Sequence, residues 1–213
     1  MTAYVFLDLD GTLTDAAPGI TRSIAYALEG MGLPVPDETV LRSCIGPALQ
    51  ETFPALGASD VDRAMTLYRE RYTTTGLYEN AVYDGAPEMM AALKAQGFRL
   101  AMATAKPIAY AAKITAHFSL AEHMDAEFGS ELDGVRTDKR DLLAYCLAKT
   151  GADPAQSFML GDRMHDARGA IHNGITPLGA LWGFGSRGEL EDAGVSAIAA
   201  TPGDVAELVE GLR

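Results

Sequence analysis

Hydrophobic positions along the chain follow two patterns, one typical of buried β-strands and one typical of amphipathic helices. From residue 98 onward, short apolar runs of strand length alternate with segments of helical spacing, an order typical of a parallel sheet with crossover helices. One further apolar run lies near the N-terminus. The predicted strands are residues 4–8, 98–104, 157–161, 176–182 and 196–200.

Helical segments fill the intervals between these strands. The segment 138–150 opens with Asp138, a residue type that caps helix N-termini, and stops before Gly151, the type most often found after a helix end. A second segment, 107–118, directly follows the strand at 98–104. The last segment places four apolar residues on one helix face: Val205, Leu208, Val209 and Leu212. We therefore predict an α/β fold, a Rossmann-like parallel sheet with helices on both faces.

Residues 18–80 follow a different pattern, because they show helical spacing throughout and contain no strand-like run. Gly46-Pro47 interrupts the second helical stripe of this stretch, and Thr73-Thr74-Thr75-Gly76 offers a linker back to the α/β part. We expect an all-helical cap domain at 18–80, inserted after the first strand. The α/β core would then consist of residues 1–17 and 81–213.

Composition and charge exclude several classes of partner and of site. The chain has 213 residues, of which 17 are Lys or Arg and 29 are Asp or Glu, giving a net charge of -12. Such a field repels nucleic acid and anionic membranes, so neither is an expected partner. Cys44 and Cys146 form no Cys-x-x-Cys pair, which argues against a zinc site or a disulfide scaffold.

The sequence also bears on location. The first apolar run stops at Asp8 without the pattern of a signal peptide, and no apolar stretch approaches the ~20 residues of a membrane span. We expect a cytoplasmic protein that acts as a monomer or a homodimer.

Polar residues gather where three predicted strands end, and the carboxyl ends of parallel strands are where such sheets bind ligands. The first strand ends in Asp8-Leu9-Asp10-Gly11-Thr12 and the second in Ala103-Thr104-Ala105-Lys106. A later strand ends in Gly161-Asp162-Arg163-Met164-His165-Asp166. Lys139, in the first turn of the helix that follows Asp138, is a fourth candidate.

Four of these side chains are carboxylates: Asp8, Asp10, Asp162 and Asp166. Two unit charges roughly 4 Å apart repel by about 4 kcal/mol at an effective dielectric constant near 20, so a cluster of carboxylates needs a counter-charge. One lysine cannot neutralise four carboxylates, whereas a divalent cation can. Because oxygen ligands favour Mg²⁺, we expect these four aspartates to form a magnesium site.

A magnesium site with a carboxylate nucleophile, a hydroxyl and a lysine is suited to phosphoryl transfer through an aspartyl-phosphate. Asp8 would be the nucleophile, and Asp10 would protonate the leaving alkoxide and then deprotonate the attacking water. Thr104, the backbone N–H of Ala105 and Lys139 would hold the phosphoryl oxygens. The expected substrate is a small phosphorylated metabolite.

In their order along the chain, these residues resemble the four motifs of the haloacid dehalogenase superfamily of phosphatases. The motifs are Asp8-Leu9-Asp10-Gly11-Thr12, Thr104, Lys139, and Gly161-Asp162 with Asp166. The helical insert is similar to that superfamily's C1 cap. Leu181-Trp182-Gly183-Phe184-Gly185-Ser186 is similar to its phosphoglycolate-phosphatase-like branch.

The resemblance implies roles for these residues. Asp8 would be the nucleophile, Asp10 the acid/base and Asp162 a metal ligand. Asp166 would orient Lys139 and the water molecules bound to the metal. Mg²⁺ would also take the backbone carbonyl of Asp10. Phosphoglycolate and nucleoside monophosphates are the substrates that the branch implies. Ala105 stands where relatives often carry Ser or Asn, which removes a possible side-chain contact.

Two other classes of function use the same residues. A phosphomutase would return the phosphoryl group to another hydroxyl, for example of a sugar phosphate, and a regulatory receiver would keep Asp8 phosphorylated as a signal. Asp10 argues against the receiver, which gains nothing from fast hydrolysis. Taken alone, Asp10-Gly11 also fits a hairpin turn, but no returning strand pattern of useful length follows it.

A dinucleotide-binding fingerprint is also present, at Gly183-Phe184-Gly185-Ser186-Arg187-Gly188, after a strand-like run. The next strand candidate ends in Thr201-Pro202, without the acidic residue that would hold a ribose, and too little chain follows for a dinucleotide fold. We interpret the segment as a glycine-rich loop near the strand-end site.

Overall fold

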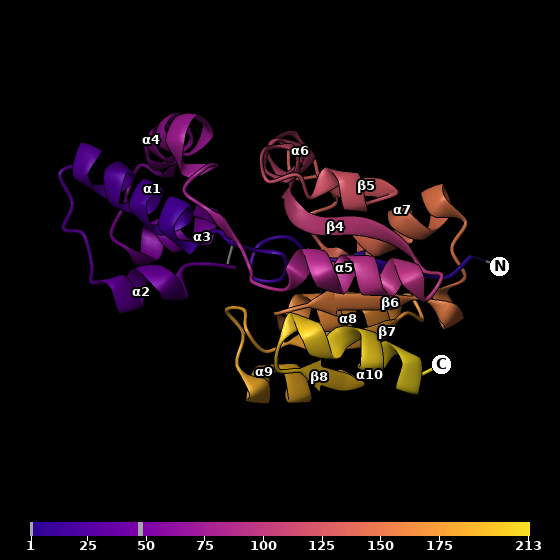
Figure 1. Cartoon of the computed structure of the whole chain (residues 1–213). Helices are drawn as coiled ribbons and strands as arrows, with labels where there is room; N and C mark the ends of the chain where they lie inside the picture. Colours follow the sequence, from indigo (N-terminus) through magenta and orange to yellow (C-terminus); the bar gives the residue numbers. More distant parts are fainter. Residues whose placement is uncertain (1, 47–48) are drawn as a thin grey trace. The chain divides into compact units, whose positions relative to one another are not determined.

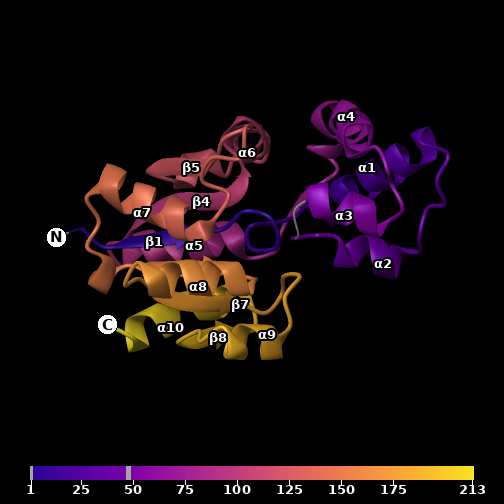
Figure 2. The ribbon, with the colours of Figure 1, turned by 180° about the vertical axis from the view of Figure 1, so that it is seen from behind.

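The computed structural model describes residues 2–46 and 49–213, which form two compact units (Figures 1 and 2). The helical unit is Ala16–Ala81, and the α/β unit contains the chain up to Asp15 and Val82–Arg213. The boundaries predicted from the sequence, after residues 17 and 80, differ slightly from these. Ala17 is already the first residue of helix α1 and therefore belongs with the helices.

Six parallel strands form the sheet of the α/β unit, in the order β5-β4-β1-β6-β7-β8. The central strands β1 and β6 are buried over their whole length, as expected for a parallel sheet covered on both faces. The strands are β1 (Tyr4–Leu7), β4 (Arg99–Pro107), β5 (Ala126–Ser130), β6 (Phe158–Gly161), β7 (Thr176–Ala180) and β8 (Ala197–Ala199).

Helices cover both faces of this sheet, as the sequence predicts. Helices α5 and α10 pack side by side on one face, whereas α7 and α8 cover the other (Figures 1 and 2). On the α7–α8 side, Phe6 and Met159 of the sheet pack against Leu142 and Cys146 of α7. The helices of this unit are α5 (Ala86–Ala95), α6 (Ile108–His117), α7 (Lys139–Thr150), α8 (Met164–His172), α9 (Arg187–Asp192) and α10 (Val205–Gly211).

The predicted ends of α7 are confirmed. The Asp138 side chain accepts a hydrogen bond from the backbone N–H of Arg140 at 2.8 Å, and Gly151 follows the helix in the left-handed conformation with φ +65°. This cap fixes where α7 begins, and hence where Lys139 lies.

Three strands were not predicted. Strand β5 contains Glu127 and Gly129, which interrupt the apolar run that marks a strand in sequence. The other two, β2 (Thr14–Asp15) and β3 (Ala81–Val82), form a separate two-stranded sheet and are too short to give a pattern. Strand β4 also extends beyond its predicted end at residue 104, as far as Pro107.

The helical unit contains α1 (Ala17–Gly30), α2 (Glu38–Ser43), α3 (Leu49–Ala55) and α4 (Val61–Arg71). The prediction of a linker at residues 73–76 is wrong, because α4 continues into a π-helical turn, η1 (Tyr72–Gly76). The hydroxyls of Thr73 and Thr74 donate back to the carbonyls of Arg69 and Glu70, both at 2.8 Å, and so keep the chain helical. Pro47, predicted to interrupt a helix, lies outside the described residues.

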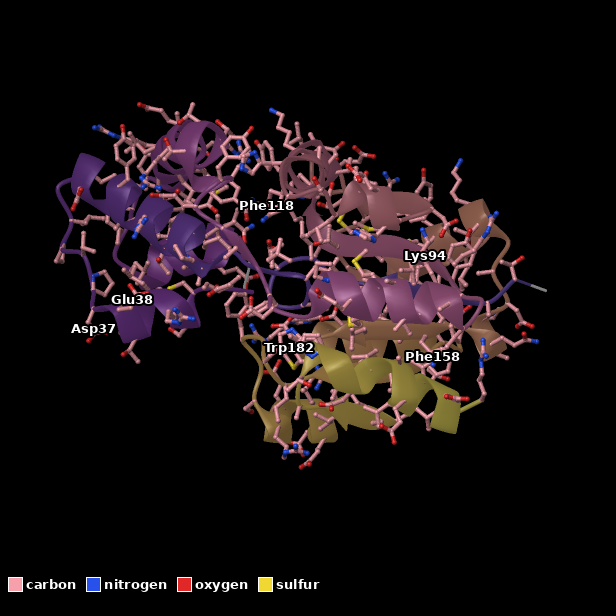
Figure 3. All side chains as sticks on the ribbon, viewed as in Figure 1. Asp37, Glu38, Lys94, Phe118, Phe158 and Trp182 are labelled. Carbon is pink, nitrogen blue, oxygen red and sulfur yellow. The ribbon has the colours of Figure 1, made fainter. Side chains whose placement is uncertain are left out.

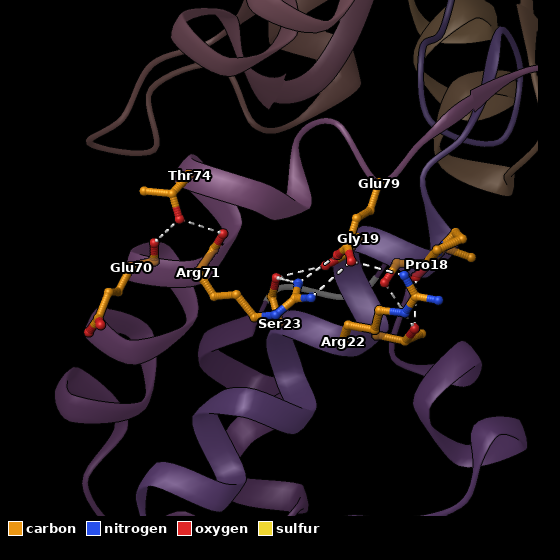
Figure 4. A network of polar contacts seen from close by, with 10 residues as sticks. Pro18, Gly19, Arg22, Ser23, Glu70, Arg71, Thr74 and Glu79 are labelled. Carbon is orange, nitrogen blue, oxygen red and sulfur yellow. Dashed lines mark hydrogen bonds and ion pairs between the residues drawn. The ribbon is translucent and has the colours of Figure 1, made fainter.

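Glu79 joins three segments of the helical unit through two arginines (Figure 4). Arg71, from the end of α4, donates to both carboxylate oxygens of Glu79, at 2.7 and 3.0 Å, and also to Ser23 of α1 at 3.2 Å. Arg22 of α1 donates to Glu79 at 2.9 Å. These bonds fix the segment after η1 against α1 and α4.

Candidate active site

The turn after β1 places Asp8 and Asp10 at the carboxyl end of the sheet, where the backbone N–H of Asp8 still donates to the carbonyl of Leu160 in β6 at 3.0 Å. Leu9 accepts backbone hydrogen bonds from Leu13 and Thr14, both at 2.9 Å, which closes the turn. Gly11 has φ +86°, and a Cβ atom there would lie 2.2 Å from Oδ2 of Asp162. The turn therefore needs glycine for its conformation and for its close packing on Asp162.

Lys139 is a buried cation, with its side chain 4% exposed. Its Nζ atom lies 2.9 Å from Oδ1 of Asp8, 2.6 Å from Oδ1 of Asp166 and 2.7 Å from the carbonyl oxygen of Ala103. The three donors of the ammonium group thus meet three acceptors. Burial alone would lower the pKa of Lys139, but the carboxylates of Asp166 and Asp8 outweigh it and raise the pKa above its usual value.

Three of the four predicted carboxylates lie together: Asp8, Asp162 and Asp166, each buried, have oxygens within 4.8 Å of one another. Burial is the largest influence on two of them. It raises the pKa of Asp162 well above its usual value and, against the opposing charge of Lys139, raises the pKa of Asp166 to about 6. Clustering these groups out of water is thus costly while they remain charged.

These residues fit a divalent cation. Three carboxylates and one lysine leave two uncompensated negative charges when all are ionised. Oδ1 of Asp8 and Oδ1 of Asp166 are buried and, apart from the ion-pair contact with Lys139, have no hydrogen-bond partner in the described part of the chain. Buried carboxylate oxygens with free lone pairs are suitable ligands for Mg²⁺.

Asp10 does not join this group through its carboxylate. Both of its oxygens face Lys106 of β4, whose Nζ atom lies 2.5 Å from Oδ2 and 2.7 Å from Oδ1. Burial raises the pKa of Asp10, and the charge of Lys106 partly opposes that rise. Lys106 is predicted from the sequence to lie at a strand end, but no role is predicted for it. A prediction that β1 and β4 are neighbouring strands would have indicated that Lys106 lies close to Asp10.

Thr104 and Ala105 lie near the end of β4, the strand next to β1. Thr104 is buried and its hydroxyl oxygen accepts from the backbone N–H of Lys106 at 3.2 Å. The carbonyl of Ala105 accepts from the hydroxyl of Ser130 at 2.8 Å. Ala103, the preceding residue, contacts Lys139, so the end of β4 adjoins the carboxylate group.

The loop after β6 is fixed at both ends. Oδ2 of Asp166 accepts from the backbone N–H of Arg163 at 3.2 Å, so Asp166 caps α8 while its other oxygen faces Lys139. Glu189 of α9 accepts from the backbone N–H of Met164 at 3.0 Å and from Nε of Arg163 at 2.8 Å. Asp166 is thus fixed at the start of α8, and Glu189 fixes the two residues that follow Asp162.

Comparison with known proteins identifies the family. The sequence pattern of the family described as haloacid dehalogenase-like hydrolase matches residues 5–180, which include all the aspartates above. The chain belongs to the haloacid dehalogenase-like hydrolases. A solved structure of a predicted phosphatase from Clostridium acetobutylicum superposes on this hydrolase with a TM-score of 0.91, at 36% identity and 99% coverage of both chains.

Two curated relatives differ in name. A 5'-nucleotidase of Pseudomonas aeruginosa is 46% identical to this hydrolase over 189 residues, 87% of this chain and 86% of that protein. The tyrosine-protein kinase PtkA of Mycobacterium tuberculosis is 37% identical over 209 residues, 98% of this chain and 72% of the kinase. Phosphoglycolate phosphatases are among the more distant relatives. Family and relatives together make this chain a phosphatase-type hydrolase.

No helix in the described part of this hydrolase combines the length and the apolarity needed to cross a bilayer.

Proposed function

We propose that this hydrolase is a Mg²⁺-dependent phosphomonoesterase that acts on a small cytoplasmic phosphate ester through an aspartyl-phosphate on Asp8. The observation that carries the proposal is the buried group of Asp8, Asp162, Asp166 and Lys139 at the carboxyl end of the sheet. Asp10, paired with Lys106, follows Asp8 after one residue and supplies a second carboxylate with separate surroundings. The two carboxylates thus face different lysines, which supports the proposal that they have separate roles.

Asp8, Asp162 and Asp166 are the side chains that would hold Mg²⁺, and the family resemblance adds the backbone carbonyl of Asp10. The Asp10 carboxylate lies outside this group of three, beside Lys106, and is therefore proposed to transfer protons rather than to ligate the metal. When bound, Mg²⁺ would neutralise charge on the phosphoryl group and so favour attack by the carboxylate of Asp8.

In the first step, a carboxylate oxygen of Asp8 attacks the phosphorus atom and the bond from phosphorus to the ester oxygen breaks. Asp10, in its protonated form, gives its proton to the departing alkoxide, which leaves as an alcohol. The products are the aspartyl-phosphate on Asp8 and the carboxylate form of Asp10.

In the second step, Asp10 takes a proton from a water molecule as that water attacks the phosphorus atom. The bond between phosphorus and Asp8 breaks, inorganic phosphate leaves, and both aspartates return to their starting states. Dividing the reaction in this way is useful because the direct hydrolysis of phosphate monoesters is among the slowest uncatalysed reactions.

Thr104, the backbone N–H of Ala105 and Lys139 are proposed to hold the phosphoryl oxygens. The contact between Lys139 and Ala103 supports this role, because it places the lysine beside the end of β4. The helical unit, Ala16–Ala81, is proposed to act as a cap that excludes bulk water during the reaction.

A nucleoside 5'-monophosphate is the first substrate to test, because the 46% identical relative is named a 5'-nucleotidase. Phosphoglycolate is the second, because several more distant relatives are named phosphoglycolate phosphatases.

The test is phosphate release from nucleoside monophosphates, 2-phosphoglycolate and sugar phosphates, measured with Mg²⁺ and with excess chelator. We expect Mg²⁺-dependent release that is fastest with a nucleoside monophosphate and is abolished by Asp8→Asn. Asp192→Asn, at an exposed position in α9, is the matched control and should retain full activity. Release that is equal with and without chelator would contradict the metal dependence.

Two rival reactions are distinguished by identifying the organic products of the same incubations and by a parallel incubation with ATP and a tyrosine-containing peptide. A phosphomutase would convert one organic phosphate into another without releasing inorganic phosphate. The name of the relative PtkA makes transfer from ATP to a tyrosine hydroxyl the second rival. Either pattern, in place of phosphate release, would overturn the hydrolase proposal.

A further inference from the structure

We propose that the loop Trp182–Gly185, here called the glycine loop, is part of the metal site and acts by holding the carboxylate of Asp162 in its ligating position. This inference rests on the proposed function, since it assumes that Asp162 ligates Mg²⁺. It concerns the segment whose sequence matches a dinucleotide-binding fingerprint.

The glycine loop contacts Asp162 directly. The backbone N–H of Phe184 donates to Oδ2 of Asp162 at 2.8 Å, and the side chain of Asp162 is fully buried. Oδ1 of the same carboxylate accepts a hydrogen bond from the hydroxyl of Thr12, at the longer distance of 3.4 Å. One oxygen is therefore held firmly by a backbone donor, while the other keeps acceptor capacity for a cation.

Two glycines allow this approach. A Cβ atom on Gly183 would lie 2.3 Å from Cβ of Asp162 and 2.3 Å from the carbonyl oxygen of Gly11. A Cβ atom on Gly185 would lie 1.9 Å from the carbonyl oxygen of Asp162. Both distances to carbonyls involve backbone atoms, which cannot rotate away as a flexible side chain can.

The third glycine of the fingerprint has no such role. A Cβ atom on Gly188 would meet no atom within 4 Å. In a dinucleotide-binding fingerprint the second glycine lets the backbone approach the pyrophosphate, and the third allows a helix to pack closely on a strand. Here the space beside Gly183 and Gly185 is filled by Asp162 and Gly11, so the glycines serve the packing of the loop on the metal site.

The glycine loop also contacts the turn that carries the nucleophile. Nε1 of Trp182 donates to the carbonyl of Thr12 at 3.0 Å. Figure 3 shows Trp182 at one end of the α/β unit and Phe158, the first residue of β6, toward the other, so this tryptophan lies near the carboxyl ends of the strands. The loop thus connects the Asp8–Thr12 turn and Asp162, which belong to two different strand ends.

The glycine loop is proposed to position Asp162 rather than to bind the metal itself, because its backbone contacts the Asp162 carboxylate. Outer-shell partners of metal ligands typically contribute 10–100-fold to metal affinity, and we expect about this loss when the loop is displaced. The main effect should be on the Mg²⁺ concentration required for half-maximal activity, with the turnover at saturating Mg²⁺ less affected.

The test compares Gly183→Ala and Gly185→Ala with Gly188→Ala, using Mg²⁺ titration by calorimetry without substrate. Circular dichroism and urea unfolding would show that each variant is folded. We expect Mg²⁺ binding about 10–100-fold weaker in the first two variants and unchanged in Gly188→Ala. A folded Gly183→Ala variant that binds Mg²⁺ as tightly as the wild type would overturn the proposal.

A milder variant keeps the test decisive if the alanine substitutions prevent folding. Trp182→Phe removes the indole N–H without adding volume, and we expect Mg²⁺ binding weaker by about 2–10-fold, the usual range for one hydrogen bond. Unchanged Mg²⁺ affinity in this variant would overturn the role of the loop. Lack of Mg²⁺ binding by the wild-type protein would instead overturn the metal site on which the proposed function depends.

Discussion

Nζ of Lys106 contacts both carboxylate oxygens of Asp10, at 2.5 and 2.7 Å, although the two residues are 96 positions apart in the sequence. The side chains are 8% and 20% exposed, so water screens the pair only in part. Neighbouring strands β1 and β4 bring the residues together. The pair restrains the carboxylate that we propose as the acid/base.

Lys106→Met should therefore weaken proton transfer by Asp10. We expect a fall in kcat of about 10²-fold, the lower end of the range for general acid–base catalysis, with an alkyl phosphate such as a nucleoside monophosphate. The fall should be smaller with p-nitrophenyl phosphate, because p-nitrophenolate leaves without needing a proton. Steady-state kinetics with both substrates would measure the difference.

Lys106→Arg retains the positive charge and should recover part of the activity. Lys113→Met, at an exposed position in α6, is the matched control and should leave kcat unchanged. Equal losses with both substrates in Lys106→Met would contradict a role through Asp10.

Lys139 is predicted to stabilise the fold as well as the site. Lys139→Met leaves the carboxylates of Asp8 and Asp166 buried without their cation. We expect a loss of about 3–5 kcal/mol in the free energy of unfolding, the usual cost of removing one partner of a buried ion pair. Urea unfolding in the absence of metal would measure it.

Lys94→Met provides the comparison, because Lys94 is exposed on α5 (Figure 3). Its free energy of unfolding should remain within about 0.5 kcal/mol of the wild type. Equal stability of Lys139→Met and the wild type would show that the buried carboxylates do not need the lysine.

Sequence patterns predicted the elements that have either a strong apolar run or a clear cap. Strands β1 and β6 are continuous apolar runs, and Asp138 and Gly151 mark the ends of α7. Strand β5 escaped prediction because its Glu127 is satisfied by tertiary structure, accepting from the hydroxyl of Thr115 in α6 at 2.5 Å. A polar partner from a distant helix leaves no local signal.

The candidate site shows the same limit. Strand ends and motif order predicted that four aspartates and Lys139 would meet, because the carboxyl ends of parallel strands meet at one edge. Asp8, Asp162, Asp166 and Lys139 do meet, whereas the predicted metal-ligand role of the Asp10 side chain is not supported, because its carboxylate faces Lys106. The pairing of Lys106 with Asp10 depends on which strands are neighbours. The packing of the glycine loop on Asp162 depends on distances of a few ångströms, and neither relationship has a periodic signature.

Glu79 should make the stability of the helical unit depend on pH. Hydrogen bonds from Arg71, and then from Arg22, hold the pKa of Glu79 below its usual value against the effect of burial. A carboxyl group with a lowered pKa in the folded state stabilises that state above its unfolded pKa of about 4.3. This contribution is lost as the pH falls through the lowered pKa of the folded state.

Glu79→Gln should reduce the stability of the helical unit at pH 7 by about 1.5–3 kcal/mol, the range for hydrogen bonds to a charged group. Below the pKa of Glu79 the variant and the wild type should converge. Hydrogen exchange of α1 and α4 at both pH values would measure this, with Glu29→Gln, exposed on α1, as the control. A difference that persists unchanged in acid would refute the electrostatic origin.

The central claim is that Asp8 carries the phosphoryl group during turnover. The most direct test is rapid mixing with a nucleoside monophosphate and Mg²⁺, acid quenching within a single turnover, and mass spectrometry of the peptide that contains Asp8 and Asp10. The account predicts one phosphoryl group on Asp8 in the wild type, and none in Asp8→Asn. Phosphate release by the wild type without a phosphorylated peptide, or phosphorylation at another residue, would contradict it.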